Sequence, residues 1–136
     1  MRSDRAQSLI EFALAVPVLL LVVLGTFDAA RAAWQLNAIG YAAREGARYA
    51  IAHGAVSEAP VGPPPLSDAA IQDTVRRASV GLPTPTVTVT WPDGDNTGGS
   101  RVTVEATIQY APVVSSYLAG GAFRLTLHGA TTQVIR

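Results

Sequence analysis

The chain has 136 residues, with ten basic and ten acidic side chains, two histidines and no cysteine. This length is enough for one small domain in addition to a membrane helix. A formal net charge of zero gives no general electrostatic attraction to nucleic acid, so no nucleic-acid partner is expected. The lack of cysteine excludes disulfides, thiolate catalysis and cysteine-based zinc sites.

An uncharged stretch rich in Leu and Val, residues 12–27, lies near the N-terminus between Glu11 and Asp28. Extended back to Gln7 as a helix, it reaches about 30 Å, the thickness of the hydrocarbon core of a bilayer. Pro17 removes one backbone donor inside it, so a kink is expected near residues 13–17. The sequence therefore predicts a single transmembrane helix over residues 7–28.

The charges before this helix predict its orientation. Arg2, Arg5 and the amino terminus outweigh Asp4, and positive charge favours the cytoplasmic side of a membrane. We therefore expect a single-pass protein of the cytoplasmic membrane, with its first residues in the cytoplasm and its C-terminal head outside.

The helix is expected to continue past the span to about residue 53, with Gly54 as its stop, because small residues recur every three or four positions. A stripe of small residues lets backbones approach closely, so we expect it to face both the head and neighbouring subunits. The stripe comprises Ala29, Ala33, Leu36, Gly40, Ala43, Ala47 and Ala50, and the opposite face carries Arg31, Gln35, Tyr41, Arg44, Glu45 and Arg48.

The remaining residues predict a small α+β head. Proline and glycine indicate an exposed linker first, then a short helix that Ser67 or Asp68 caps, and then strands whose apolar residues alternate with polar ones. The expected elements are a helix to Ser79, strands at Thr86–Trp91 and Arg101–Tyr110 joined by a long hairpin loop at 92–100, and a third strand from Phe123.

The expected fold class is thus α+β, a pilin-like layout in which a long N-terminal helix meets a short second helix and an antiparallel sheet of about three strands. The expected organisation is a short cytoplasmic leader at 1–6, a transmembrane helix at 7–28, an extracytoplasmic continuation of that helix at 29–53, a linker at 54–66 and a head at 67–136 that packs on the helix.

Glu11 is the most unusual residue of the span, because a carboxylate at the edge of hydrocarbon is costly unless it finds a partner or a proton. Two interpretations stay open. Ser8 and Glu11 fit a capping box at the start of a helix. Alternatively, the chain is cut between Ala6 and Gln7, and Glu11 pairs with the new amine of Gln7 in its own chain or in an adjacent subunit.

The segments Ala6-Gln7-Ser8-Leu9-Ile10-Glu11-Phe12 and Ala42-Ala43-Arg44-Glu45-Gly46-Ala47-Arg48, together with Pro17, Gly25 and Asp28, resemble the TadE-like pseudopilin family. The resemblance implies a minor pilin of the tight-adherence (Tad, type IVc) system. It implies processing by an aspartic prepilin peptidase, and partners that include the major Flp pilin, other minor pilins and the Tad inner-membrane platform. It implies no catalytic activity and no cofactor. The family usually has Gly before the cut, where this chain has Ala6.

Arg44, Glu45 and Arg48 on the continuing helix have two interpretations. A Glu and an Arg three residues apart form a solvated pair along one helix face, which contributes little. The same charges are also candidates for pairing between subunits or for docking the head.

The remaining polar residues favour structural roles. We expect His53 to interact with the C-terminal end of the helix and His128 to lie on the polar face of a strand, so a metal site is not expected. Asp93, Asp95 and Asn96 suit a turn better than a calcium loop, because the full EF-hand spacing is missing. No set of nucleophile, base and orienting residue is recognisable, so an enzyme is not expected.

Two other functions compete with the pilin interpretation. Ala30-Arg31-Ala32 fits a signal-peptidase site, which would release a secreted binding module beginning at Ala33. An uncleaved single-pass anchor with a structural head would instead keep Met1. The start of the mature chain separates the three.

Overall fold

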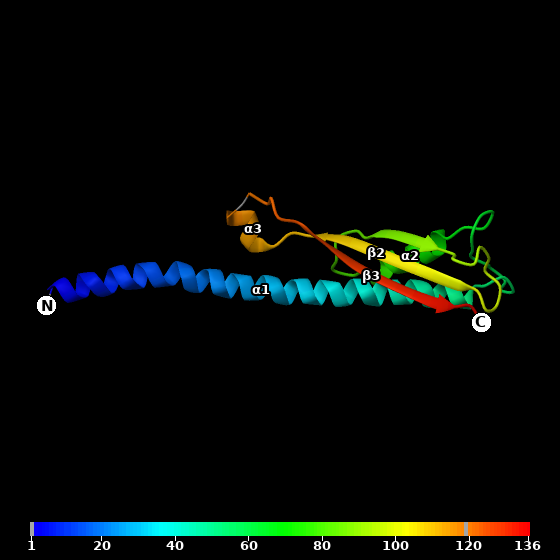
Figure 1. The fold of residues 1–136 in the computed structure, drawn as a ribbon, viewed down its shortest axis with the longest axis horizontal. Helices are drawn as coiled ribbons and strands as arrows, with labels where there is room; N and C mark the ends of the chain where they lie inside the picture. The colour runs from blue at the N-terminus through cyan, green and yellow to red at the C-terminus, as the bar shows by residue number, and fades with distance from the viewer. Residues whose placement is uncertain (1, 119) are drawn as a thin grey trace. The chain divides into compact units, whose positions relative to one another are not determined.

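The computed structural model describes residues 2–118 and 120–136, with the side chains of residues 6–117 and 120–136. The fold is α+β, as the sequence predicts, with two further helices and a three-stranded antiparallel sheet following one long helix (Figure 1). In chain order the elements are α1 (Arg2–Ala52), α2 (Ala69–Ala78), β1 (Thr86–Thr90), β2 (Arg101–Tyr110), α3 (Val113–Leu118) and β3 (Leu125–Val134).

The chain forms two compact units, and α1 contributes to both. The N-terminal unit contains the residues up to Ala33 together with Ala111–Arg124. The head unit contains Trp34–Tyr110 and Leu125–Arg136.

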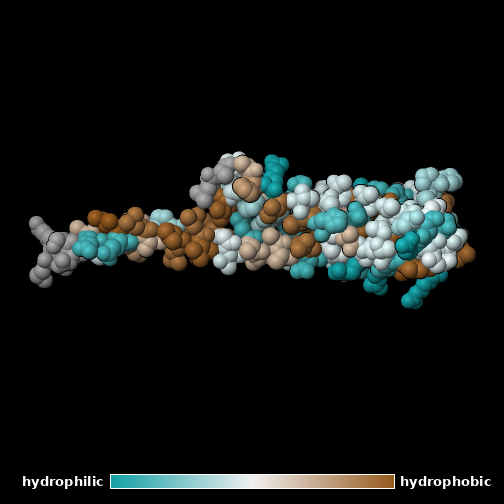
Figure 2. Space-filling model, in the orientation of Figure 1, coloured by the Kyte–Doolittle hydropathy of each residue, from teal (hydrophilic) through white to brown (hydrophobic). Residues whose placement is uncertain are grey.

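In the N-terminal unit, α1 continues through Pro17 without interruption. Its large apolar side chains from Leu9 to Phe27 are exposed apart from Val16, which is partly buried, and Leu14 reaches 70% exposure. Figure 2 shows these hydrophobic side chains on the surface of α1. This stretch is long and apolar enough to cross a membrane, as the sequence predicts.

The head unit is built on the sheet, whose strands follow the order β1-β2-β3 and are antiparallel. Residues along β2 alternate between buried and more exposed, because successive side chains point to opposite faces. On the outer face, threonines pair across strands, with 2.8 Å between the hydroxyls of Thr103 and Thr132. The inner face buries Val102, Val104, Ala106, Ile108 and Tyr110.

The second half of α1 and helix α2 complete this core. Gly46 of α1 lies where the three elements meet, because a side chain there would touch Val75 and Ile71 of α2 and Val104 of β2. Gly129 of β3 lies directly against the α1 backbone, since a Cβ at this position would stand 2.8 Å from backbone atoms of Ile39 and Gly40. Small residues therefore let the helix and the sheet approach closely.

The buried face of α1 differs from the predicted stripe. Ala29, Ala33 and Leu36 are exposed, whereas Gln35, predicted on the polar face, is only 2% exposed. Among the described residues, the Oε1 atom of Gln35 has no hydrogen-bond partner. The prediction is confirmed for Ala43, Ala47 and Ala50 and was wrong for the earlier residues, because alanines occur on more than one face of α1 and do not by themselves identify the face that meets the sheet. The residues of α1 that are buried against the head are Gln35, Ile39, Ala42, Ala43, Gly46, Ala47 and Ala50.

The linker at 54–66 contains neither helix nor strand. The sequence predicts that it is exposed, but the structure buries part of it. Val61 is buried in the core, and its carbonyl accepts a hydrogen bond of 2.9 Å from the Asn96 side chain. The Val61 amide donates to the His53 carbonyl, also at 2.9 Å. These bonds hold the linker against the end of α1 and the hairpin loop.

The third strand begins at Leu125, so the predicted start at Phe123 was wrong. The backbone of Phe123 is used elsewhere, since its carbonyl accepts a hydrogen bond of 3.2 Å from the Ser115 hydroxyl. Ser115 belongs to α3, a helix of six residues that the sequence did not predict. A turn through Gly120 and Gly121, both with positive φ, follows α3 and leads to β3.

Candidate assembly site

The candidate processing site, Ala6 and Gln7, lies on the surface of α1. Arg2 to Ala6 of the predicted leader are helical, and Met1 lies outside the described residues. The side-chain amide of Gln7 donates a hydrogen bond of 3.2 Å to the Glu11 carboxylate, one helical turn away.

The start of α1 excludes one of the two interpretations of Glu11. The capping-box interpretation was wrong, because α1 begins at Arg2 and the Ser8 amide is not at the start of the helix. Glu11 is exposed beside the apolar surface, and its Gln7 partner is an uncharged amide. An amide donates a hydrogen bond without neutralising a carboxylate, so the cost of placing Glu11 at a hydrocarbon edge is only partly offset.

Asp28 ends the apolar stretch and has a structural role that sequence reasoning missed. It is 6% exposed, and its two carboxylate oxygens accept hydrogen bonds from the amides of Val113, at 2.8 Å, and Val114, at 2.9 Å. Asp28 thereby binds the first amides of α3, which lies beside α1 at this level (Figure 1). An isolated acid after an apolar run was the only sequence signal, and it did not identify a partner 85 residues away.

Arg44, Glu45 and Arg48 lie together on the part of α1 that belongs to the head unit. Arg48 Nη1 is 3.4 Å from Glu45 Oε1, three residues along the helix; Arg48 and Arg44 are exposed and Glu45 is partly buried. Such a pair contributes only a few tenths of a kcal/mol in water. The structure thus places the six predicted site residues in two groups, one in each unit.

The two histidines occupy the predicted structural positions. His53 follows the last residue of α1, where its Nδ1 lies 2.9 Å from the Tyr49 carbonyl oxygen and its ring stacks on the Tyr49 ring. His128 is on the outer face of the sheet, 3.7 Å from the Glu105 carboxylate.

The acidic loop between β1 and β2 is held by its own hydrogen bonds. Asp93 binds the Arg101 guanidinium at 2.7 Å and the Arg101 amide at 2.8 Å, and these bonds lower the pKa of Asp93 to about 2. The pKa of Asp95 is also lowered, mainly because the Ser100 hydroxyl donates to its carboxylate, and Thr97 adds two further bonds. These carboxylates form turns, and no group of three or more metal-ligating side chains occurs in the described part of the chain.

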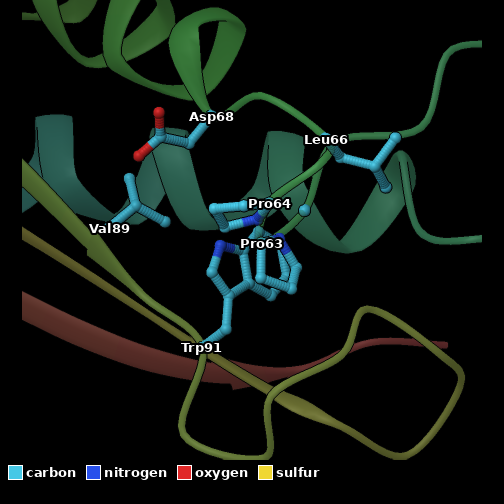
Figure 3. A pocket seen from close by; sticks show the side chains of 7 residues that line it. Pro63, Pro64, Leu66, Asp68, Val89 and Trp91 are labelled. Carbon is cyan, nitrogen blue, oxygen red and sulfur yellow. The ribbon is translucent and has the colours of Figure 1, made fainter.

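A pocket in the head unit lies between the linker, the start of α2 and the end of β1 (Figure 3). Its volume is about 150 Å³, well below the 300 Å³ or more typical of a small-molecule site. Asp68 at its rim already accepts a hydrogen bond of 3.2 Å from the Gln72 side chain. The pocket is therefore smaller than a typical small-molecule site. It is lined by Gly62, Pro63, Pro64, Leu66, Asp68, Val89 and Trp91.

Comparison with known proteins identifies one family. Residues 6–48 match the family described as TadE-like protein, which confirms the resemblance predicted from the sequence over the segment that contains all six candidate residues. No curated protein and no solved structure matches the chain. The TadE-like family is a structural family linked to Tad pilus systems, and together with the apolar helix it fits a membrane-anchored protein.

Proposed function

We propose, from the match of residues 6–48 to the TadE-like family, that this chain is a minor pilin or pseudopilin that takes part in assembling a Tad (type IVc, Flp) pilus for surface attachment. The observation that carries the proposal is the division of α1. Its first half exposes an apolar surface in which Glu11 is the charged residue, while one face of its second half is covered by a folded head. A subunit built in this way has its lipid- or filament-facing segment and its displayed domain on one helix.

The proposed topology places the N-terminus in the cytoplasm, residues 7–28 in the bilayer and the head outside. The uncharged stretch fits a single span, and the positive charges before it favour this orientation. In this topology the leader faces a prepilin peptidase at the membrane. Cleavage between Ala6 and Gln7 would leave a new positive amine one helical turn from Glu11.

Glu11 then has an assembly role. In the uncut chain the one partner of its carboxylate among the interactions described is the uncharged Gln7 side-chain amide. The amine of a neighbouring subunit's Gln7, or of its own, would neutralise that charge. Pairing between subunits would favour insertion of the chain in register with the major Flp pilin and other minor pilins.

The exposed face of α1 in the head unit supports lateral contacts with such subunits. Trp34 and Tyr41 are both about half exposed and lie seven residues apart on one side of this part of the helix, and the exposed Arg44 and Arg48 follow Tyr41 by three and seven residues. Aromatic and arginine side chains are enriched in protein interfaces. We therefore propose that this face, with the Glu45–Arg48 pair, contacts neighbouring pilins or the Tad inner-membrane platform.

The decisive experiment is intact-mass measurement and N-terminal sequencing of the protein from membranes of its native host. The proposal expects a chain that begins at Gln7. A chain that begins at Ala33 would contradict it and favour a secreted module, and a chain that keeps Met1 or Arg2 would favour an uncleaved anchor.

Three substitutions test the roles of individual residues. Ala6→Phe should abolish cleavage, because a bulky side chain replaces a small one beside the cut. Glu11→Ala should leave cleavage intact and reduce incorporation into pili, with Glu58→Ala in the exposed linker as the control that changes neither.

Arg48→Glu tests the lateral face: normal protein level with unchanged piliation would remove Arg48 from the interface.

A further inference from the structure

The segment Ala111–Arg124, here called the α3 segment, belongs to the same compact unit as the apolar half of α1. Asp28 fixes it there, because both oxygens of a nearly buried carboxylate accept amides from the first turn of α3. Hydrogen bonds to an ionised group are the stronger kind. Asp28 is also the first charged residue after the apolar stretch. The start of α3 therefore lies at the level where the span ends.

The side chains that this segment presents are aromatic and exposed. Tyr117 is 84% exposed and Phe123 is 66% exposed. Two hydrogen bonds close the segment into one short loop: the Gly121 amide donates to the Ser115 carbonyl at 3.1 Å, and the Ser115 hydroxyl donates to the Phe123 carbonyl at 3.2 Å. Both rings therefore belong to one structured loop. On α1, Leu24 and Phe27 are exposed one turn and one residue before Asp28.

The chemistry of the segment selects a lipid surface as the partner. Between Ala111 and Arg124 there is no acidic residue, and the only charged one is Arg124. Aromatic rings with a polar edge concentrate at the membrane–water interface, and a cationic side chain favours anionic headgroups.

We propose that the α3 segment is an interfacial membrane element, which inserts Tyr117 and Phe123 into the outer surface of the bilayer that α1 crosses. The inference rests on the proposed membrane anchoring and adds a second membrane contact to it, encoded about 90 residues after the first. Because Asp28 joins the two contacts, the loop fixes how deeply α1 sits. Extraction of the subunit into a filament then requires these two rings to leave the lipid.

Site-directed spin labelling tests this directly, because the natural chain has no cysteine. Full-length protein with Tyr117→Cys or Phe123→Cys is labelled and reconstituted into vesicles of phosphatidylcholine and phosphatidylglycerol. Collision with oxygen, which enters lipid, is compared with collision with a water-soluble nickel complex. Two controls bracket the scale: Val18→Cys in the apolar stretch, and Val56→Cys in the linker, where the side chain is 96% exposed.

The expected oxygen-to-nickel collision ratio at positions 117 and 123 is several-fold above that at position 56 and approaches that at position 18. Ratios at 117 and 123 equal to that at 56, with position 18 in lipid, would overturn the interfacial loop and leave the anchor standing. A water-accessible position 18 would overturn both. Protection at 117 that disappears at low protein-to-lipid ratio would assign the surface to a second copy of the chain and overturn the lipid assignment.

A second variant keeps an aromatic ring at the tested position. Tyr117→Trp is combined with Trp34→Phe and Trp91→Phe, which replace the two natural tryptophans. Lipids brominated near the headgroup should quench this single fluorophore more than lipids brominated at the chain end. Absence of quenching by either lipid would contradict the proposal even if the cysteine variants perturb the loop.

Discussion

The two halves of α1 are covered in opposite ways. From Leu9 to Phe27 the helix presents large Leu, Val and Phe side chains, and all of them except the partly buried Val16 are exposed. From Ile39 to Ala50 it presents mainly Ala and Gly to the sheet, and the residues on that face are completely buried. One continuous helix thus contains a half that its own chain covers and a half that it leaves uncovered.

Residue size explains the difference. Burial of apolar area stabilises by about 25 cal/mol per Å², so burying the Leu and Val side chains of the first half would contribute a large stabilising free energy. Within the N-terminal unit, the α3 segment is the other part of the chain that accompanies this half. Alanine and glycine offer little area, but they let another backbone come close, so the sheet itself supplies the contacts. The covered half therefore depends on exact fit within the chain, and in the proposed function lipid or other subunits cover the other half.

The largest expected effect comes from Gly129→Val, which breaks the close approach in the covered half. Its Cβ would stand 2.8 Å from backbone atoms of Ile39 and Gly40, and backbone cannot turn aside as a flexible side chain can. We expect the free energy of unfolding of the head to fall by about 3 kcal/mol. Urea unfolding of the full chain in detergent micelles, followed by tryptophan fluorescence, measures this.

Gly98→Ala is the matched control, because its Cβ meets its nearest atom at an ordinary 3.7 Å. It should change the stability by a few tenths of a kcal/mol at most. If Gly129→Val matched this control, β3 would not lie against α1 as described.

Asp28→Ala tests the contact in the N-terminal unit and should have the next largest effect. Two amides of α3 lose an ionised acceptor, which we expect to destabilise the α3 segment locally by about 2 kcal/mol. Hydrogen exchange at Val113 and Val114 should accelerate roughly 30-fold, while exchange in β2 stays unchanged. Asp73→Ala, which removes only exposed pairs on α2, is the control, and equal exchange in both variants would contradict the role of Asp28.

These contacts show which parts of the molecule could be predicted from sequence. The alternation of apolar and polar residues from Arg101 to Tyr110 predicted β2 with its observed ends, because a period of two residues identifies a strand with one buried face. The long helix followed from uninterrupted helical periodicity. In contrast, α3 has six residues and depends on Asp28 far away in the chain, so no local pattern identifies it.

The covered face of α1 was only partly predictable for a related reason. The spacing of alanines fits several faces of the helix equally well. Contacts with the sheet, such as Gly129 against Ile39, determine which face is buried. Burial of Gln35 is the clearest departure, since a polar side chain is ordinarily assigned to the solvent face. For the candidate site, the local pair of Gln7 and Glu11 is within reach of sequence reasoning, whereas contacts between subunits are properties of an assembly.

Gly46→Ala and Gly25→Ala together compare the two halves with the same chemical change. Both add a methyl group to α1 and gain about 1 kcal/mol of helix propensity. At Gly46 the new Cβ collides with Val75 of α2, whereas at Gly25 it meets nothing within 4 Å. Overpacking of about 2 kcal/mol should leave Gly46→Ala less stable by about 1 kcal/mol, and Gly25→Ala should not destabilise the head. Equal urea midpoints for the two variants would show that the halves do not differ in this way.

The smallest expected effect lies at the far edge of the head, where charge rather than packing holds the hairpin loop. The pKa of Asp93 is lowered from 3.8 to about 2, because the Arg101 guanidinium and amide both donate to the carboxylate. A depressed folded-state pKa means that this contribution to stability is complete above about pH 4 and is lost as the pH falls through about 2.

Asp93→Asn should therefore flatten the fall in unfolding free energy over that interval. The difference in unfolding free energy between pH 4 and pH 7 should stay close to that of the natural chain. Arg101→Gln should flatten it equally, since it removes the donor that lowers the pKa. Some slope should remain in both variants, because Asp95 keeps its own lowered pKa through Ser100 and Thr97. A wild-type slope in Asp93→Asn would place the acid sensitivity of the head elsewhere.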